Sequence, residues 1–230
     1  MSVCELHDPA VIERALRTNE AIHIYEIGDL DDFFRPYTRW FARGDTHDPD
    51  AVVLLYTGGE TPTVIGLSED PAGLREILAS VSDLLPERFY AHLTEGAESA
   101  LIPPFSGTSQ GRHLKMLRRG TLPAITGTLP VRLDRDCVGE LQSFYDYSYP
   151  GHWFDPRMLE TGKYFGIRRN GRLVSAAGIH VYSPNYKVAA IGNVATHPQF
   201  RRRGLAGHVT SAVCRSLRDH IEHIGLNVGA

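Results

Sequence analysis

The sequence predicts an α/β fold of the α+β kind, with mixed but mostly antiparallel sheets flanked by helices in two lobes. Three observations lead to this prediction. Short apolar runs that are typical of strands are separated by turn residues. The dipeptide Asn170-Gly171, whose residues suit the positive φ angles of a tight hairpin, joins two such runs. In each half of the chain, a segment with apolar residues on one helical face follows the strands, at 71–85 and from about 202 to 223.

The first lobe is assigned to residues 1–125. Asp8 and Pro9 are typical of the start of a helix, the first as its capping residue and the second in its first turn. Residues 29–43 are rich in aromatic side chains, and we expect them to be partly helical with a break at Pro36. The other elements predicted for this lobe are helices at 9–18 and 71–85 and strands at 51–57, 63–67, 88–93 and 113–119.

The second lobe is assigned to residues 126–230, because a stretch at 120–130 that is rich in glycine and proline marks a seam. Its predicted elements are a helical, aromatic region at 134–160, hairpin strands at 164–169 and 172–182, a strand at 186–196, the helix from about 202 to 223 and a strand that begins at 226. Both halves share the order strand, turn, strand, helix, strand. This shared order suggests that the first lobe is a degenerate copy of the second.

Composition and charge argue against several classes of protein. The chain has 24 basic and 27 acidic side chains and a net charge of −3, whereas a dedicated nucleic-acid-binding protein is usually basic. Its 3 cysteines are widely spaced and form no C-x-x-C pair, so we expect neither a disulfide framework nor a metal site. A charged N-terminus and the lack of a run of about 18 apolar residues argue against a signal peptide and a membrane span. We therefore expect a cytoplasmic protein that binds neither nucleic acid nor membrane.

One segment, from Asn193 to Gly207, has the features of an anion-binding site. An apolar strand ends at Thr196, and the proline after it stops strand pairing because it has no N–H group. A helix then opens with Arg201, Gly204 and Ala206 in the pattern R-x-x-G-x-A. The first N–H groups of a helix have no partner within the helix and carry partial positive charge. The small residues let a diphosphate approach the main chain, and three consecutive arginines add charge around it.

This arrangement resembles the motif that binds the pyrophosphate of acetyl-CoA in the GNAT superfamily of acyl-CoA-dependent N-acetyltransferases. The resemblance covers roughly residues 130–230 and includes the order of the elements. It implies a GNAT-like fold, acetyl-CoA as the acyl donor and no metal. The cofactor-binding residues that it implies are the main chain of Val194, Ala195 and Thr196 for pantetheine and the thioester carbonyl, and Arg201, Arg202, Arg203, Gly204, Leu205, Ala206 and Gly207 for the diphosphate. Two further candidates are Asn227, which could reach pantetheine, and Asn193, which could bond to pantetheine or close a strand bulge beside Gly192.

The activity that the resemblance implies is transfer of an acetyl or other short acyl group to an amine, which attacks the thioester directly. His180 is a candidate proton acceptor because an imidazole ordinarily titrates near neutral pH. Tyr182, two residues later, shares its face of the strand and is a second candidate. The residues predicted to wall the acceptor site are Tyr145, Tyr147, Tyr149 and Trp153. The alternative for each of these side chains is a structural role in packing.

Two departures from the family pattern accompany this interpretation. Family members continue past the last predicted strand with a helix that often carries the acid for the leaving thiolate, so we expect the second lobe to be cut short at Ala230. In the first lobe, Glu69 and Asp70 lie at the matching turn and would repel a diphosphate.

Two rival functions stay open. One is a non-catalytic CoA-binding or scaffolding module on the same fold. The other is a nucleic-acid-associated protein that uses Arg201–Arg203, against which the net negative charge argues. The sequence leaves open whether the acceptor is a small molecule or a peptide amine, and whether the chain is a monomer or a homodimer.

Overall fold

The computed structural model describes residues 2–125 and 127–230, which form two compact units. The first unit extends to Arg112 and the second comprises His113–Gly229. The division lies before the predicted seam because β6 (His113–Leu117) pairs with β11 (His223–Gly229) in the sheet of the second unit. Thr126, the first residue of the predicted second lobe, lies outside the described residues.

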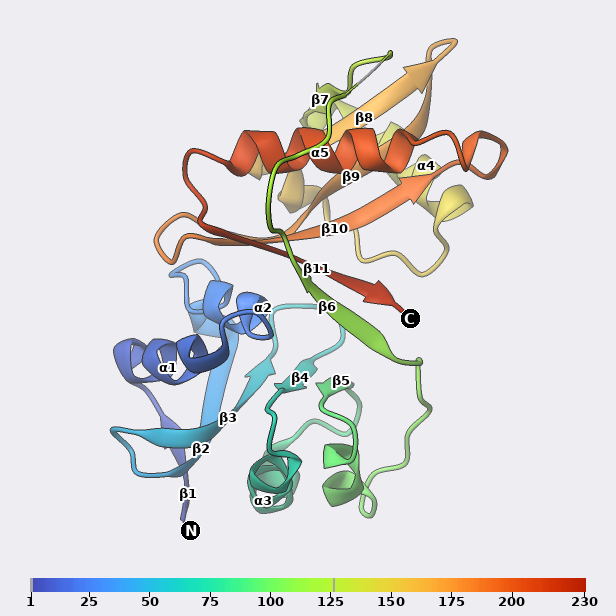
Figure 1. The fold of residues 1–230 in the computed structure, drawn as a ribbon. Coiled ribbons are helices and arrows are strands. Elements are labelled where there is room, and N and C mark those ends of the chain that lie inside the picture. Colours follow the sequence, from blue (N-terminus) through green and yellow to red (C-terminus); the bar gives the residue numbers. More distant parts are fainter. Residues whose placement is uncertain (1, 126) are drawn as a thin grey trace. The chain divides into compact units, whose positions relative to one another are not determined.

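The first unit is built on a five-stranded sheet with the order β1-β2-β3-β4-β5 (Figure 1). Neighbouring strands are antiparallel except for β4 and β5, which run parallel and are connected through a helix. The strands are β1 (Val3–Leu6), β2 (Thr38–Gly44), β3 (Pro49–Tyr56), β4 (Thr63–Gly66) and β5 (Tyr90–Leu93). The helices are α1 (Pro9–Leu16), α2 (Ile24–Gly28) and α3 (Pro71–Val81).

The prediction of partly helical structure at 29–43 was wrong for its second half, which forms β2. A short 3-10 helix, Arg35–Tyr37, precedes the strand. β2 lies between β1 and β3, and its middle residues Trp40 and Phe41 point to opposite faces yet are 4% and 2% exposed. A strand that is buried on both faces has no alternation of apolar and polar residues, so the usual sequence signal is missing.

The second unit is built on a six-stranded sheet with the order β6-β11-β10-β9-β8-β7. Only β10 and β11 run parallel. The strands not yet delimited are β7 (Val131–Leu133), β8 (Tyr164–Arg169), β9 (Arg172–Ser183) and β10 (Val188–Thr196). The helices are α4 (Val138–Ser148) and α5 (Leu205–Leu217), which pack on opposite faces of the sheet (Figure 1).

The hairpin predicted at Asn170-Gly171 is present, and the two turn residues have φ angles of 50° and 76°. The helix predicted to reach residue 223 instead ends at Leu217. The main-chain N–H groups of Glu222 and His223 both donate to the carbonyl of Lys187. The chain has therefore already turned toward the sheet before β11 begins.

The two units share one topology apart from β6, which has no counterpart in the first sheet. From β1 in the first unit and from β7 in the second, a strand is followed by helical segments, three antiparallel strands, a helix and a strand that is parallel to the one before the helix. The predicted fold class, with mostly antiparallel sheets flanked by helices, is confirmed. Among the residues that the structure describes, no helix is long and apolar enough to cross a membrane.

Candidate functional site

The parallel strands β10 and β11 separate halfway along β10. Their register runs from the pair Val188 and His223 to the pair Ile191 and Leu226. β11 then continues in register only with β6, whereas β10 continues beside β9 as far as Thr196. The second half of β10 therefore borders an opening in the sheet, where main-chain groups can meet a ligand.

A β-bulge lies at the start of this opening. Gly192 pairs with Gly178 and Ala195 pairs with Ala176, so the two residues between them on β10 lie opposite one residue of β9. Asn193, the first of these two, has a φ angle of 52°. Asparagine tolerates this left-handed conformation better than most residues. Bulges of this kind redirect main-chain groups and are frequent beside functional sites.

The start of α5 forms an open cradle for an anion. Gly204 caps the helix with a φ angle of 74° and no side chain hydrogen-bonds to the first turn. The N–H of His208, which donates to the carbonyl of Gly204 at 3.1 Å, makes the first hydrogen bond of the helix. The three preceding N–H groups, those of Leu205, Ala206 and Gly207, have no acceptor among the described residues. The helix dipole adds partial positive charge to these free donors.

The space in front of the cradle is clear of protein atoms. A Cβ atom added to Gly204 or Gly207 would meet nothing within 4 Å. A hollow of about 350 Å³ lies here, with Thr196, Phe200, Arg201, Arg202, Gly204, Leu205 and Ala206 in its walls. A diphosphate fits the chemistry of this wall, because it accepts hydrogen bonds from main-chain N–H groups and is drawn to cations.

The three arginines before the helix have different surroundings. Arg201 donates from Nε to the carbonyl of Thr196 at 3.1 Å and from Nη2 to the carbonyl of Ser148 at 3.2 Å. Its guanidinium therefore ties the end of β10 to the end of α4. Arg202 is exposed, and Arg203 places its guanidinium 5.3 Å from the centre of the Phe200 ring. Arg201 supports the loop, while the other two supply positive charge at its rim.

The matching helix start in the first unit is closed by its own side chain. The carboxylate of Asp70 accepts hydrogen bonds from the N–H groups of Ala72 at 2.9 Å and Gly73 at 3.3 Å. These bonds lower the pKa of Asp70, and Nη2 of Arg43 lies 3.4 Å from Oδ2, the oxygen that accepts from Gly73. A carboxylate thus already holds the place that an anionic ligand would take, so this helix start is closed whereas the one at Gly204 is open.

His180 lies near the opening, where it packs on β10. It is the bulged residue of β9 between the pairs formed by Ile179 and Val181. Its ring covers Gly192 so closely that a Cβ atom there would lie 1.7 Å from Cδ2 of His180. Burial lowers the pKa of His180 from 6.5 to about 4. The imidazole is therefore neutral at neutral pH and a weaker base than an exposed histidine. Its catalytic role stays a prediction.

The shifted pKa of His180 predicts a loss of stability in mild acid. Between pH 6.5 and about 4 the unfolded chain binds a proton at this residue that the folded chain rejects. The stability that neutral His180 contributes is therefore fully present above this window, and it is lost as the pH falls through the window. Between pH 7 and pH 5, the free energy of unfolding measured with urea should fall by about 2 kcal/mol more for the wild type than for His180→Gln. Equal losses in the two proteins would contradict the shift.

Tyr182 lies toward the other end of the neighbouring helix. Its ring centre is 5.3 Å from Nζ of Lys163, which donates to the carbonyl of Ser216 at 2.8 Å. Ser216 belongs to the last turn of α5, whereas the cradle is formed by the first turn. These contacts place Tyr182 at the C-terminal end of α5, and the catalytic role predicted for it stays untested.

The four aromatic residues predicted to wall the acceptor site do not share one environment. Tyr145 is 0% exposed, because it lies on the α4 face that packs on the sheet, so it lines no surface. Tyr147 is 62% exposed, and its ring stacks on His197 with centres 5.0 Å apart. Tyr149 and Trp153 are 43% and 48% exposed. These three exposed side chains are accessible to an acceptor, whereas Tyr145 belongs to the core.

Polar side chains inside the unit include Tyr164, which the sequence did not indicate, and Asn193 and Asn227, which it did. Asn193 donates from Nδ2 to the hydroxyl of Tyr164 at 2.9 Å, although Tyr164 looks in the sequence like the apolar start of a strand. The Oδ1 atoms of Asn193 and Asn227 are buried without a hydrogen-bond partner among the described residues. Such acceptors are costly unless a ligand or water satisfies them. Among the residues that the structure describes, no group of three metal-ligating side chains occurs.

Comparison with known proteins agrees with this architecture. Residues 141–229 match the family model described as "Acetyltransferase (GNAT) domain". A Drosophila protein solved by structural genomics has a TM-score of 0.59 at 15% identity, with coverage of 99% of this chain and 89% of its own. A GNAT-family acetyltransferase from Colwellia psychrerythraea has a TM-score of 0.52 at 12% identity, with coverage of 99% and 90%. At these identities the likeness concerns the fold alone.

A third solved structure is described as an acetyltransferase of the GNAT family from Novosphingobium aromaticivorans. It shares 26% identity over 51% of this chain and 52% of its own, with a TM-score of 0.42. This chain therefore spans about half the length of that relative. No curated protein matches the chain.

Proposed function

Because residues 141–229 match the GNAT acetyltransferase domain, we propose that this protein transfers an acetyl or other short acyl group from acyl-CoA to an amine. The observation that carries the proposal is the open cradle at the start of α5, which adjoins the opening between β10 and β11. The cradle offers free N–H donors and two exposed arginines to a diphosphate.

In the proposed complex, the rest of the cofactor lies along the second half of β10. The diphosphate accepts hydrogen bonds from the N–H groups of Leu205, Ala206 and Gly207. Pantetheine carries amide N–H groups, and these would donate to the buried Oδ1 atoms of Asn193 and Asn227. The pairing satisfies two acceptors that lack protein partners among the described residues, and it is worth about 1 kcal/mol for each hydrogen bond.

The proposed reaction is direct attack of the amine on the thioester carbonyl. The C–N bond forms and the C–S bond breaks, while the amine loses a proton and the thiolate leaves and takes one up. Main-chain N–H groups near Val194 stabilise the negative charge that develops on the carbonyl oxygen. The site holds the two reactants together, which can supply several kcal/mol of the barrier. His180, which is neutral and close to the opening, is the proposed proton acceptor.

The proposed acceptor is a small molecule or a peptide that carries an amine. Tyr147, Tyr149 and Trp153 are exposed, and Ser148 of the same segment contacts Arg201 beside the cradle. Aromatic faces bind ammonium groups, which suits an acceptor that arrives protonated and loses its proton before attack.

Calorimetric titration with CoA tests the proposal. We expect one CoA to bind per chain, because Asp70 closes the matching helix start of the first unit. Release of free thiol from acetyl-CoA in the presence of an amine panel would then establish turnover. Two equal CoA sites, or none, would contradict the assignment of a single open cradle.

The alternative is a CoA-binding module that does not catalyse transfer. Its support is the low pKa of His180, which leaves the site without a strong base at neutral pH. Tight CoA binding without thiol release for any amine in the panel would favour this alternative.

A further inference from the structure

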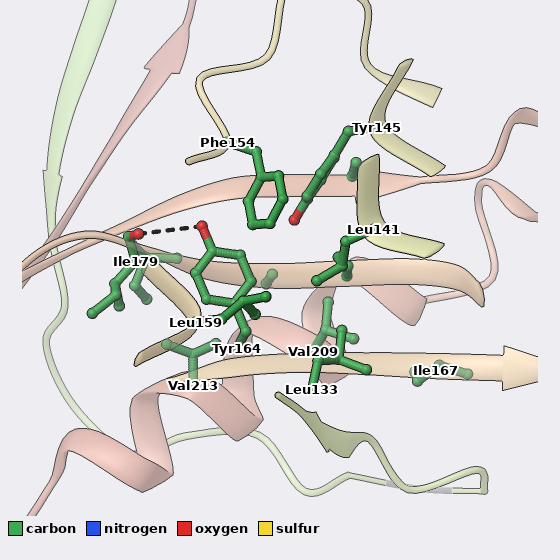
Figure 2. Close-up of a cluster of buried hydrophobic side chains, with 14 of the residues drawn as sticks. Leu133, Leu141, Tyr145, Phe154, Leu159, Tyr164, Ile167, Ile179, Val209 and Val213 are labelled. Carbon is green, nitrogen blue, oxygen red and sulfur yellow. Dashed lines mark hydrogen bonds between the residues drawn. The ribbon is translucent and has the colours of Figure 1, made fainter. Parts of the chain in front are cut away.

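Two buried hydroxyl groups hold the chain at Asn193. Tyr145 donates to the main-chain carbonyl of Asn193 at 2.8 Å, and Asn193 donates from Nδ2 to the hydroxyl of Tyr164 at 2.9 Å. The hydroxyl of Tyr164 in turn donates to the carbonyl of Ile179 at 3.4 Å (Figure 2). Both tyrosines are 0% exposed and Asn193 is 3% exposed. These contacts therefore join residues of α4, β8, β9 and β10 around Asn193.

The residues next to the two tyrosines leave room for their rings and pack against them. The ring of Tyr164 crosses β9 over Gly178, where a Cβ atom would lie 2.2 Å from Cζ of the ring. Phe154 packs against both tyrosine rings, with centres 5.3 Å from Tyr145 and 5.7 Å from Tyr164 (Figure 2). Burial raises the pKa of both hydroxyls, so they remain protonated over the pH range in which proteins work. The two groups are therefore permanent hydrogen-bond partners of Asn193.

These hydrogen bonds act on the bulge that borders the opening in the sheet. Asn193 has a left-handed φ angle of 52°, a conformation that its neighbours must hold. Its carbonyl points at the hydroxyl of Tyr145. In a planar trans peptide, the N–H of the next residue points opposite to the carbonyl. The N–H of Val194 therefore points away from Tyr145, and its direction depends on the hydrogen bond that Tyr145 makes.

We propose that Tyr145 and Tyr164 are positioning residues that lock the bulge at Asn193 and thereby aim the Val194 N–H at the acyl carbonyl oxygen. The inference rests on the proposed function, because it assigns these residues a part in the same acyl-transfer site. Neither tyrosine contacts the reacting atoms. They act through the main chain, and preorganised donors of this kind stabilise the developing oxyanion.

Steady-state kinetics and CoA binding of four variants test the lock. Tyr145→Phe and Tyr164→Phe should each lower kcat by about tenfold, less than the loss of an entire oxyanion donor. For the two tyrosine variants the Kd for CoA should stay within about twofold, because CoA has no acyl carbonyl and its diphosphate binds at α5. Asn193→Gly should retain more activity than Asn193→Ala, because glycine adopts positive φ without strain. Activity that is equal in Asn193→Gly and Asn193→Ala, or a kcat that falls together with CoA affinity in either tyrosine variant, would overturn the proposal.

Leu141→Ala is the matched control. Leu141 lies on the same face of α4 and is 0% exposed, so the variant weakens the same core but leaves both hydroxyls in place. We expect its kcat to stay close to that of the wild type. A fall equal to that of Tyr145→Phe would show that loss of core packing, and not of the hydrogen bond, accounts for the effect.

An amide NMR spectrum separates this inference from the proposed function. The Val194 resonance should move in Tyr145→Phe and stay near its wild-type position in Leu141→Ala. An unchanged resonance in Tyr145→Phe would overturn the lock even in an active enzyme. If the wild type neither binds CoA nor releases thiol, the proposed function fails, while the spectrum still decides whether Tyr145 sets the environment of the Val194 amide.

Discussion

Replacing Gly204 with aspartate is expected to weaken CoA binding at least about 100-fold, or about 3 kcal/mol. The new carboxylate would face the free N–H groups of α5, as the carboxylate of Asp70 faces those of α3, and would repel the diphosphate. The second unit should remain folded, because a Cβ atom at this position meets nothing within 4 Å. Calorimetry with CoA measures the loss, and circular dichroism confirms the fold.

Gly204→Asn is the matched control for this prediction. It shares the shape of the aspartate side chain and the cost of a positive φ angle, about 1 kcal/mol, but carries no charge. Asparagine should therefore reduce CoA affinity much less than aspartate. Equal affinities for the two variants would show that charge at the start of α5 does not govern binding.

Replacing Gly192 with alanine is expected to destabilise the second unit by about 2–3 kcal/mol. The added Cβ atom would lie 1.7 Å from Cδ2 and 2.1 Å from Nε2 of His180, so the imidazole must leave its place over β10. Urea unfolding measures the loss of stability. A cost below about 0.5 kcal/mol, the usual range for surface positions, would contradict the close packing of the two residues.

A double-mutant cycle identifies the contact that causes this effect. His180→Ala removes the ring that the new methyl group strikes, so Gly192→Ala should cost much less in that background. The costs of substitutions at residues in contact are not additive, and the coupling energy here should be about 1–2 kcal/mol. Additive costs would mean that the strain from Gly192→Ala arises elsewhere than at His180.

Local signals in the sequence predicted those parts of the fold that depend on neighbours along the chain. The turn at Asn170-Gly171 and the start of α1 at Asp8 and Pro9 are present because few residues suit those main-chain conformations. The pairing of β6 with β11 was not predictable in this way. It joins segments more than a hundred residues apart, and strand patterns do not specify distant partners.

In the candidate site too, features that depend on neighbours along the chain were predictable, whereas contacts between distant segments were not. The open helix start at Gly204 follows from small residues after a strand, which is a local pattern. The role of Tyr145 was misread as part of a surface wall, although its spacing from Leu141 and Ser148 matches one helical face that packs on the sheet. Tyr164 gave no signal, because its importance arises from a hydrogen bond to a residue on another strand.

The most direct test of the central claim is a crystal structure of this protein with CoA. We expect diphosphate oxygens to lie within hydrogen-bond distance of the N–H groups of Ala206 and Gly207, with pantetheine beside the second half of β10. A cofactor bound at any other place, or a cradle occupied by the protein's own side chains while CoA is present, would contradict it.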